Sequence, residues 1–445
     1  MRASLAEIVG AEHVLAGDTR EYLHDSTDTR GVQGHADAVV LPGTAEEVAA
    51  VLAWCYERDV PITPRGGGTG YAGGAVPLGG VVLSLERLTR VRSFDPLLWR
   101  IEVEAGVRTG EVHRLARESG LFFPPDPGGA EQSQIGGNIA TNAGGPHAFK
   151  YGVTGKWVTG LEAAVPPGEL VRTGGPLRKD VAGYDLKALL VGSEGTLAIV
   201  TAAWLRLLPA PEAVHPVVAF YAGARAGCDA LLRVVGSGLE AAALEYVDGG
   251  ALAAAGPSYP GTIPAGTGFM VIAEADGSRR EAARLRGDLL SVLGEGALGA
   301  ATPSPGELWR WRHGVVFAVI AKRGGKLGED IAVPLDRLAE AIEESVALGG
   351  HYGLEAVSWG HAGDGNLHTN FLLDPEDPEE LARAERAGEE LFELALRLGG
   401  TVSGEHGLGL LKRGHAGWPP RVAGLQQAIK DAFDPKGLLN PGKKL

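Results

Sequence analysis

Two histidines stand seven residues apart in a glycine-rich stretch late in the chain. The stretch reads HAGDGNLHTN and runs from His361 to Asn370. A helix would bring both rings onto one face, but Gly363 and Gly365 disfavour a helix, and a straight strand would put the rings on opposite faces. We therefore expect a loop that folds back so that both imidazoles face inward, an arrangement that suits a metal ion. On these residues alone, one histidine in a turn and one in a strand, without a metal, fit as well.

A second stretch adds a carboxylate and a third imidazole. In GTVSGEHGLGLLKR, residues 400–413, Glu405 and His406 lie in a glycine-rich loop that we expect to follow a short strand. Two histidines and one carboxylate form a sensible donor set for a divalent ion and leave coordination positions open for a substrate.

A third stretch, LWRWRHGVVFAVIAKRGGKLGEDIAVP, places cations in a mostly apolar setting. Arginine is the side chain best suited to grip a carboxylate with two parallel hydrogen bonds. Arg312 and Lys326 are the candidates for binding a carboxylate. For Arg310, Lys322 and Arg323 we expect solvation at the surface.

Composition narrows the class of protein. A chain of 445 residues exceeds one comfortable hydrophobic core, so we expect two domains or three. The net charge of −14 disfavours nucleic acid or an anionic membrane as a direct partner. No apolar run is long enough to span a bilayer and the first residues lack a signal-peptide pattern, so a cytoplasmic location is the default. With Cys55 and Cys228 as the only cysteines, this chain alone holds no iron–sulfur cluster, and a disulfide framework is disfavoured.

Glycine is abundant, with 68 residues gathered in a few stretches. The first such stretch follows a predicted βαβ unit: a strand over Ala38–Leu41, a helix that starts with a capping box at Thr44 and Glu47, and a strand over Val60–Thr63. In the loop after it, Gly68, Gly70 and Gly73 match the G-x-G-x-x-G fingerprint of dinucleotide-binding folds. That fingerprint requires a helix directly afterwards, whereas here a β-rich segment follows, so a Rossmann site is excluded. A strand-to-strand loop remains whose bare N–H groups could cradle a pyrophosphate.

Two further glycine clusters lie at residues 124–145 (PPDPGGAEQSQIGGNIATNAGG) and 183–209 (GYDLKALLVGSEGTLAIVTAAWLRLLP). We interpret all three clusters as loops, and the third enters a β-rich run. Any one of them could be an ordinary tight turn, but three together favour one shared ligand. The composition changes near Pro209–Pro211, which suggests a domain boundary there, and residues 378–398 read as a long amphipathic helix.

The stretches PRGGGTGYAGG, IGGNIATNAGG and AGYDLKALLVGSEGTLAIVT resemble the FAD domain of the vanillyl-alcohol oxidase/p-cresol methylhydroxylase superfamily. The resemblance implies that the glycine loops hold the FAD pyrophosphate and that the other two stretches line the adenosine and the isoalloxazine. The first loop has Thr69-Gly70-Tyr71 and no His or Cys to which a flavin could be attached, so we expect noncovalent FAD. The residues that the resemblance assigns to FAD are Arg65, Gly66, Gly67, Gly68, Thr69, Gly70, Gly136, Gly137, Asn138, Thr141, Gly144, Gly195, Ile199 and Asn440.

The chemistry-bearing stretches of the second half resemble the C-terminal domain of FAD-linked D-2-hydroxyacid dehydrogenases, which include D-lactate and D-2-hydroxyglutarate dehydrogenases and the D subunit of glycolate oxidase. The resemblance assigns a divalent metal to His361, His368 and Glu405, and Zn²⁺ and Mn²⁺ both tolerate such ligands. It makes His406 the catalytic base, Asn370 a substrate contact, Arg312 the carboxylate-binding arginine and, more loosely, Lys326 a second cation. Asp364 is expected to be a turn residue or to orient a ligand histidine. The closing DAFDPKGLLNPGK also fits, with Asn440 where the tail returns to the flavin.

One position departs from the 2-hydroxyglutarate branch. That branch has a Thr four residues after the arginine that helps to hold a distal carboxylate, whereas this chain has Val316. The departure favours a smaller acid such as lactate or glycolate.

Together these features predict an α+β protein with a p-cresol-methylhydroxylase-type FAD-binding domain over residues 1–209 and a substrate (cap) domain over 210–445. We expect the cap domain to have an antiparallel sheet flanked by helices and about residues 405–445 to return to the FAD domain. The predicted activity is metal-assisted oxidation of a small D-2-hydroxy acid to its 2-oxo acid.

Electrons would leave through a partner iron–sulfur subunit, a quinone, a cytochrome or dioxygen, and such a partner could associate the protein with a membrane. A homodimer or a hetero-oligomer would fit. Three alternatives stay open: a noncatalytic flavin subunit of a larger complex, another flavin enzyme of the superfamily such as an alkylglycerone-phosphate synthase, and a flavin-free iron oxygenase.

Overall fold

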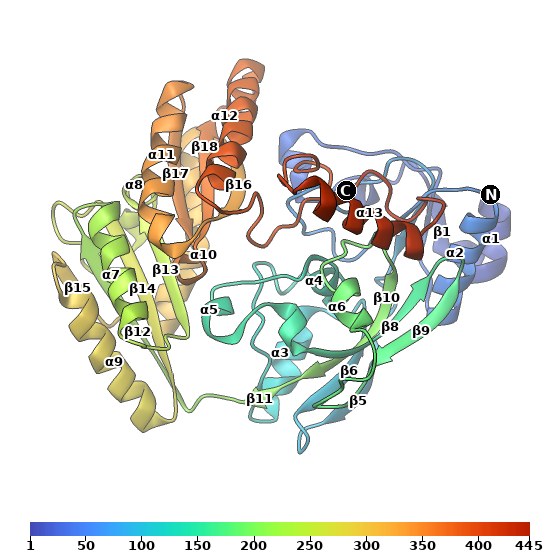
Figure 1. Ribbon diagram of the computed structural model, residues 1–445, viewed down its shortest axis with the longest axis horizontal. Helices are drawn as coiled ribbons and strands as arrows, with labels where there is room; N and C mark the ends of the chain where they lie inside the picture. The colour runs from blue at the N-terminus through green and yellow to red at the C-terminus, as the bar shows by residue number, and fades with distance from the viewer. The chain divides into compact units, whose positions relative to one another are not determined.

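The computed structural model describes residues 1–445, with the side chains of every residue except 28 and 29. The chain divides into two compact units. The first comprises Met1–Gly144, Gly152–Ala210 and Glu405–Leu445, and the second comprises Gly145–Tyr151 and Pro211–Gly404. Both ends of the chain therefore build the first unit, and in Figure 1 the red helix α13 (Pro420–Phe433) lies among its blue and green elements.

The first unit contains a mainly parallel sheet in the order β1-β2-β4-β3, an antiparallel sheet in the order β5-β6-β10-β8-β9, and the short pair β11-β7. Its strands are β1 (Val14–Ala16), β2 (Ala38–Val40), β3 (Ile62–Arg65), β4 (Val81–Ser84), β5 (Val91–Asp95), β6 (Arg100–Glu104), β7 (Leu121–Phe122), β8 (Val158–Val165), β9 (Glu169–Gly174), β10 (Ile199–Arg206) and β11 (Leu208–Pro209). Its helices, besides α13, are α1 (Arg2–Val9), α2 (Ala45–Glu57), α3 (Thr109–Glu118), α4 (Ile135–Thr141) and α6 (Leu186–Leu190).

The predicted βαβ unit is present as β2-α2-β3. The Thr44 hydroxyl accepts a hydrogen bond from the Glu47 N–H at 3.1 Å, and the Glu47 carboxylate reaches back to the N–H of Gly43 at 2.7 Å, which caps α2 from both sides. The strand begins at Ile62 rather than at Val60, because the Val60 N–H still bonds to the Cys55 carbonyl at the end of the helix. After β3 the chain passes to another strand, β4, as predicted.

The second glycine stretch, residues 124–145, was expected to be a loop, but its residues Ile135–Thr141 form the short helix α4. Glycine is a poor helix former, but tertiary packing overrides that preference here. A Cβ atom on Gly136 would lie 2.7 Å from the Ala105 Cβ, so only glycine lets the helix approach this closely. Asn142, in the left-handed region at a φ of 53°, ends the helix.

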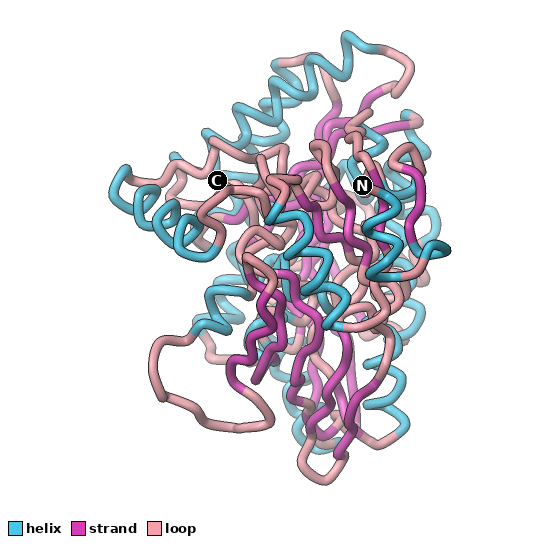
Figure 2. The backbone as a smooth tube through the Cα atoms, turned by 90° about the vertical axis from the view of Figure 1, so that its right-hand side faces the viewer, coloured by secondary structure: helices cyan, strands magenta, loops and turns pink.

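The second unit is built on one seven-stranded antiparallel sheet in the order β15-β12-β14-β13-β17-β18-β16. Its strands are β12 (Ala213–Tyr221), β13 (Ala243–Asp248), β14 (Phe269–Gly277), β15 (Gly299–Ala301), β16 (Gly325–Ala332), β17 (Glu355–Gly360) and β18 (Asn366–Leu373). Its helices are α5 (Ala148–Tyr151), α7 (Ala224–Gly236), α8 (Gly249–Ala255), α9 (Arg279–Gly294), α10 (Pro305–Arg323), α11 (Leu338–His351) and α12 (Pro378–Arg397). In Figure 2 the strands are magenta and the flanking helices cyan.

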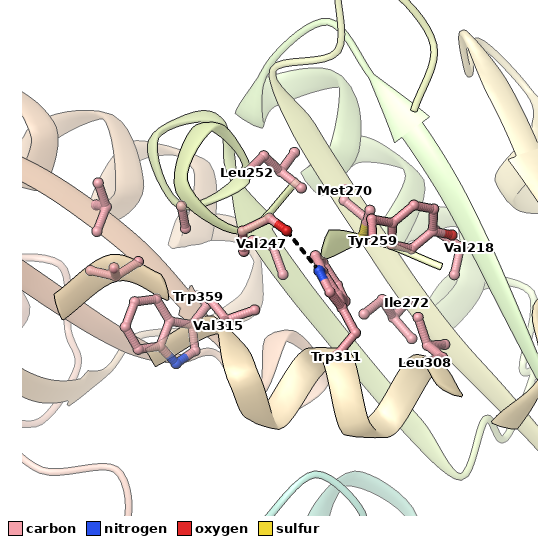
Figure 3. Close-up of a cluster of buried hydrophobic side chains, with 14 of the residues drawn as sticks. Val218, Val247, Leu252, Tyr259, Met270, Ile272, Leu308, Trp311, Val315 and Trp359 are labelled. Carbon is pink, nitrogen blue, oxygen red and sulfur yellow. Dashed lines mark hydrogen bonds between the residues drawn. The ribbon is translucent and has the colours of Figure 1, made fainter. Parts of the chain in front are cut away.

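Helices α8 and α10 pack on one face of this sheet. Figure 3 shows Leu308, Trp311 and Val315 of α10 directed toward strand residues such as Val247 and Ile272. The Trp311 ring N–H also donates a hydrogen bond to the Ala255 carbonyl at 2.9 Å, which joins α10 to α8. This packing fixes the rotation of α10 and therefore the direction in which Arg312, the next residue, leaves the helix.

Within the part of the chain that the structure describes, no helix combines the length and the apolar character that crossing a membrane requires.

Candidate active site

The two histidines of HAGDGNLHTN lie on a β-hairpin in the second unit. His361 directly follows β17, the short 3₁₀ turn η7 (Ala362–Asp364) reverses the chain, and His368 lies within β18. Their Nε2 atoms face each other at 3.5 Å, with the ring planes nearly perpendicular at 88°. Gly365 closes the turn at a φ of 67°, where a Cβ would lie 1.9 Å from the Val333 carbonyl oxygen. The hairpin thus brings the two rings together.

A buried carboxylate stands behind each ring. A carboxylate oxygen of Glu245 lies 2.5 Å from the Nδ1 atom of His361, and one of Asp330 lies 3.9 Å from the Nδ1 atom of His368. Both carboxylates are fully buried. Burial alone would raise the pKa of the Glu245 carboxyl, but His361 and Arg312 together hold that pKa below its ordinary value.

Asp330 also organises the approach of the chain to Glu405. Its carboxylate accepts hydrogen bonds from the Asn366 amide at 2.5 Å, the Ser403 hydroxyl at 3.0 Å and the Gly404 N–H at 3.0 Å. Glu405 is the next residue after Gly404. One carboxylate oxygen of Glu405 and one ring nitrogen of each histidine all lie within 4.8 Å of one another. The strand expected before Glu405 is reduced to a single bridge between Thr401 and Ala332.

These residues fit a divalent metal. The Nε2 atoms face each other, and Glu245 accepts a hydrogen bond from the Nδ1 atom of His361, which is the arrangement by which proteins orient a histidine ligand toward a metal. Two imidazoles and one carboxylate are donors that Zn²⁺ and Mn²⁺ both accept.

Two cationic groups lie on the same unit. Arg312 is buried, and its Nη2 group donates to Glu245 at 2.5 Å. Its Nε atom is buried and has no hydrogen-bond partner among the atoms described. Lys326 of β16 donates to the Asn370 side-chain oxygen at 2.5 Å, and the Asn370 amide donates to the His368 carbonyl at 2.8 Å. The pairing of β16 with β18 therefore lets Lys326 reach Asn370, which lies two residues after His368 on β18.

The remaining cations of this stretch behave as surface residues. Lys322 pairs with Glu355, Arg323 pairs with Glu380 at 2.8 Å, and Arg310 is exposed. Asp364 also lies exposed, in the η7 turn. Glu245 hydrogen-bonds directly to His361, while Asp330 lies farther from His368.

In the first unit the glycine stretches meet. A Cβ on Gly66 would lie 3.4 Å from the Gly137 Cα, and one on Gly67 would lie 2.4 Å from the Gln132 carbonyl oxygen. The first glycine loop therefore touches α4 at Gly66, and at Gly67 it approaches the backbone just before α4 at a distance that a side chain would prevent. Within α4 the Thr141 hydroxyl donates to the Gly137 carbonyl, and the Asn138 amide donates to Thr109 at 2.5 Å.

The third stretch is joined to the other two. The N–H groups of Gly192 and Glu194 donate to carbonyls of α4 at 2.8 and 2.7 Å. Gly195 has a φ of 69°, and a Cβ there would lie 2.9 Å from Pro64 in β3. Ile199 is buried at the start of β10. The three stretches that the sequence singles out thus form one continuous surface of backbone.

The C-terminal tail closes this arrangement. Asn440, buried at a φ of 44°, donates through its side-chain amide to the carbonyls of Gly74 at 3.0 Å and Glu194 at 2.8 Å. The Glu194 carboxylate in turn accepts from the N–H groups of Leu408 and Gly409 at 3.0 and 2.7 Å. Glu194 therefore fixes the loop that carries His406.

His406 lies beside the first glycine loop. Its ring stands 4.9 Å from the ring of Tyr71, centroid to centroid, and its Nε2 atom is 3.8 Å from a carboxylate oxygen of Glu405. A Cβ on Gly144 would lie 2.9 Å from the other Glu405 oxygen. Gly144, Tyr71 and His406 thus come together around Glu405.

The first unit fits a flavin nucleotide. Bare backbone of three glycine stretches converges, and two buried side-chain oxygens beside it, Gln134 Oε1 and Asn440 Oδ1, have no partner among the atoms described. Arg65, expected among the FAD contacts, donates through its guanidinium to the backbone carbonyls of His24 at 2.6 Å and Glu21 at 2.8 Å. The Arg65 side chain therefore joins the start of the glycine loop to residues 21–24, and Thr69 and Gly70 lie farther along that loop.

Sequence reasoning missed Glu245, Asp330 and Glu194 as parts of the site. Glu245 and Asp330 are charged side chains in strands, as in ALEYVD around Glu245, whereas Glu194 lies in the glycine-rich turn GSEGT; all three are buried. For Glu245 and Asp330, a charge in a run that reads as a buried strand was the available signal, because such a group needs a partner.

Comparison with known proteins gives two family matches along the chain. Residues 36–174 match the model of the FAD binding domain, and residues 210–444 match that of the C-terminal domain of FAD linked oxidases. The chain is 34% identical over 451 residues to the glycolate oxidase subunit GlcD of Bacillus subtilis, covering all of this chain and 96% of that protein. It is 36% identical over 433 residues to a D-2-hydroxyglutarate dehydrogenase of Xanthomonas citri pv. viticola, covering 91% and 88% of the two chains. The solved structure of p-cresol methylhydroxylase with substrate bound superposes with a TM-score of 0.82 at 21% identity, covering all of this chain and 96% of that one.

The fold and the matches define a flavoprotein with a p-cresol-methylhydroxylase-like FAD-binding fold. The chain belongs to the FAD-linked oxidase family, in the group of glycolate oxidase D subunits and D-2-hydroxyacid dehydrogenases. It is an FAD-linked oxidoreductase, as the sequence predicts.

Proposed function

We propose that the protein oxidises a small D-2-hydroxy acid to its 2-oxo acid with the help of a divalent metal. One observation carries the proposal: His361, His368 and Glu405 present metal-type donors, with Lys326 and Asn370 beside His368, in a chain that has an FAD-binding domain. A flavin-only electron carrier would have no use for that donor set.

The substrate carboxylate would be held by the cationic groups of the second unit. Arg312 keeps an unpartnered Nε donor although its Nη2 group is engaged with Glu245. Lys326 is oriented by Asn370 and supplies a second positive charge. Charge-assisted hydrogen bonds of this kind are roughly twice as strong as neutral ones, so they can hold a small acid in one orientation.

The metal would be held by His361, His368 and Glu405, with Zn²⁺ and Mn²⁺ as the candidates. A divalent ion there would lower the pKa of a coordinated substrate hydroxyl, which eases removal of its proton near neutral pH. Glu245 keeps the Nε2 atom of His361 directed inward, and the Asp330 carboxylate lies 3.9 Å from the Nδ1 atom of His368.

His406 is the residue that would take the hydroxyl proton, because imidazole is the side chain whose ordinary pKa suits a base near neutrality. The O–H and Cα–H bonds of the substrate break and a C=O bond forms. Noncovalent FAD at the glycine stretches would supply the oxidation by accepting the Cα hydride at N5. The Tyr71 ring, tilted by 37° to the His406 ring at a centroid distance of 4.9 Å, limits the orientations open to that base.

The size of the acid is suggested by Val316 on α10, four residues after Arg312. Val316 packs against the apolar cluster beneath α10 and offers no hydrogen bond to a second carboxylate. Glycolate and D-lactate therefore fit better than D-2-hydroxyglutarate, although a relative named for the latter shares 36% identity.

Electrons must then leave the reduced flavin. Because a close relative is named as a subunit of glycolate oxidase, we include a protein acceptor, such as an iron–sulfur subunit, alongside a quinone or a cytochrome. A noncatalytic flavin subunit of such a complex is the second candidate.

The test is anaerobic mixing of the purified holoprotein with D-lactate, L-lactate, glycolate and D-2-hydroxyglutarate, followed by the visible absorbance of the flavin. Rapid bleaching by D-lactate or glycolate, but not by L-lactate, is the expected result. Flavin that none of the four acids bleaches would leave the noncatalytic subunit as the better description.

A further inference from the structure

The buried carboxylate of Glu245 contacts both a candidate metal ligand, His361, and the candidate substrate-binding arginine, Arg312. Glu245 comes from β13, which is paired with β17 directly before His361. One of its oxygens lies 2.5 Å from the Nδ1 atom of His361, and the other accepts from the Arg312 Nη2 group at 2.5 Å. The Glu245 side chain is fully buried, so these two partners meet it without competing water.

The contact with His361 selects one form of that ring. A carboxylate accepts hydrogen bonds, so the Nδ1 atom of His361 must carry the proton, and the lone pair of the neutral ring then lies on Nε2. That is the atom that faces His368. Without Glu245 the ring could rotate or adopt the other tautomer.

The contact with Arg312 fixes the guanidinium. One N–H group of the guanidinium is engaged with Glu245, and the Nε donor is buried and has no partner among the described atoms, so it is available to a ligand. Because the guanidinium is planar, fixing one N–H group restricts the directions of the others.

We propose that Glu245 is a positioning residue that acts on both catalytic groups at once, orienting His361 toward the metal and Arg312 toward the substrate carboxylate. The inference rests on the proposed function, since it assumes that these two residues bind the metal and the acid. It predicts that metal binding and carboxylate binding weaken together when Glu245 is changed.

The experiment compares Glu245→Gln with Glu274→Gln in the full-length holoprotein. Glu274 is a matched control: it is a buried glutamate on the neighbouring strand β14 that also bonds to a histidine, His147, at 2.8 Å, and to Trp309 at 2.5 Å. Two equilibrium constants are measured without turnover. One is the dissociation constant for Mn²⁺ after chelation, and the other is that for propionate, a lactate isostere that lacks the hydroxyl, read from the flavin spectrum.

Glu245→Gln should weaken Mn²⁺ binding by roughly 10- to 100-fold, the usual cost of losing a group that orients a metal ligand. It should also weaken propionate binding by about tenfold, the cost of losing one good charge-assisted contact. Glu274→Gln should leave both constants close to those of the unmodified protein. Tighter propionate binding in Glu245→Gln would overturn the proposal, because it would show that Glu245 only neutralises Arg312. Unchanged Mn²⁺ binding would overturn it as well.

A second measurement needs no substitution at position 245. In ¹⁵N-histidine-labelled, metal-free protein, with the His361 signals assigned through His361→Gln, the proton of the neutral ring should reside on Nδ1. A proton on Nε2 would contradict the role of Glu245 even if Glu245→Gln failed to fold. If the unmodified protein bound no Mn²⁺, the proposed participation of a metal in the reaction would be wrong. The ¹⁵N spectrum would still show whether Glu245 holds the proton of His361 on Nδ1.

Discussion

Val316 is a single side chain that tests the choice of substrate. It lies on α10 four residues after Arg312, and is half-buried against the apolar cluster of the second unit. A threonine there keeps the shape of the side chain and has a hydroxyl in place of one methyl group. Val316→Thr should therefore raise kcat/KM for D-2-hydroxyglutarate relative to D-lactate by about tenfold, the value of one hydrogen bond to a charged group.

The measurement is kcat/KM for both acids in Val316→Thr and in Val315→Thr. Val315 is the fully buried neighbour, so its substitution should lower stability without changing the ratio. A ratio that moves equally in both variants would remove Val316 as a determinant of specificity.

The sequence predicts contacts between residues that are close together in the chain and misses contacts between residues that are far apart in it. His361 and His368 share one ten-residue stretch, and the glycine spacing between them already implies a reversal of the chain. Glu245 is separated from His361 by 116 residues and from Arg312 by 67, so no spacing rule connects it to either. Its role follows only from the pairing of β13 with β17.

At the scale of elements, the β17–β18 hairpin is held in shape by Gly365. A side chain at this position meets both a left-handed φ of 67° and a Cβ contact of 1.9 Å with the Val333 carbonyl oxygen. Gly365→Ala should destabilise the second unit by about 1–3 kcal/mol and weaken metal binding, since the hairpin must shift to admit the methyl group.

Gly353→Ala is the matched control, because Gly353 has a φ of 66° but nothing within 4 Å of a Cβ. It should cost only about 1 kcal/mol, from the backbone conformation alone, and leave the dissociation constant for Mn²⁺ unchanged. Thermal unfolding and Mn²⁺ titration of both variants check this prediction. Equal metal affinities in the two variants would mean that the turn does not position the histidines.

The buried carboxylate of Asp248 links α8 to β17. It accepts from the N–H groups of Ala251 at 2.8 Å and Ser358 at 2.6 Å, and its burial raises the pKa of the carboxyl to about 6. Because this pKa is above the unfolded value near 4, the folded state retains the proton between about pH 4 and pH 6. The contribution of Asp248 to stability is therefore present below about pH 4 and is lost as the pH rises through 6, by an amount on the order of 3 kcal/mol.

Asp248→Asn has no such titration. The free energy of unfolding of the unmodified protein minus that of the variant should consequently fall as the pH rises from about 4 to about 7. Urea unfolding of the two proteins across this range measures the difference. A difference that stays constant would show that Asp248 does not titrate there.

Among the elements, those with strong local signals are predicted well. The capping box at Thr44 and the apolar periodicity behind it indicate α2, and the amphipathic pattern of residues 378–398 matches α12 (Pro378–Arg397). The helix α4 is missed because its glycines oppose helix formation locally, and close packing on Ala105 stabilises it instead.

At the scale of the whole molecule, the chain does not divide into two consecutive halves. Residues Gly145–Tyr151 belong to the second unit although the residues on either side belong to the first. This segment is held to β14 by His147, which contacts Glu274, and by Lys150 and Tyr151, which both contact Asp276. Such a short insertion has no compositional signature, since its partners are more than a hundred residues away.

If a divalent metal takes part in oxidation of a D-2-hydroxy acid, removing the metal should slow reduction of the flavin. The holoprotein, treated with a chelator and verified to be free of metal, is mixed anaerobically with D-lactate or glycolate, and the rate of flavin bleaching is followed before and after Mn²⁺ or Zn²⁺ is restored. Bleaching should slow by about a hundredfold or more without metal and recover with it, because the hydroxyl proton then lacks the several kcal/mol of help that the ion supplies. Metal-free protein that bleaches at the original rate would contradict the account.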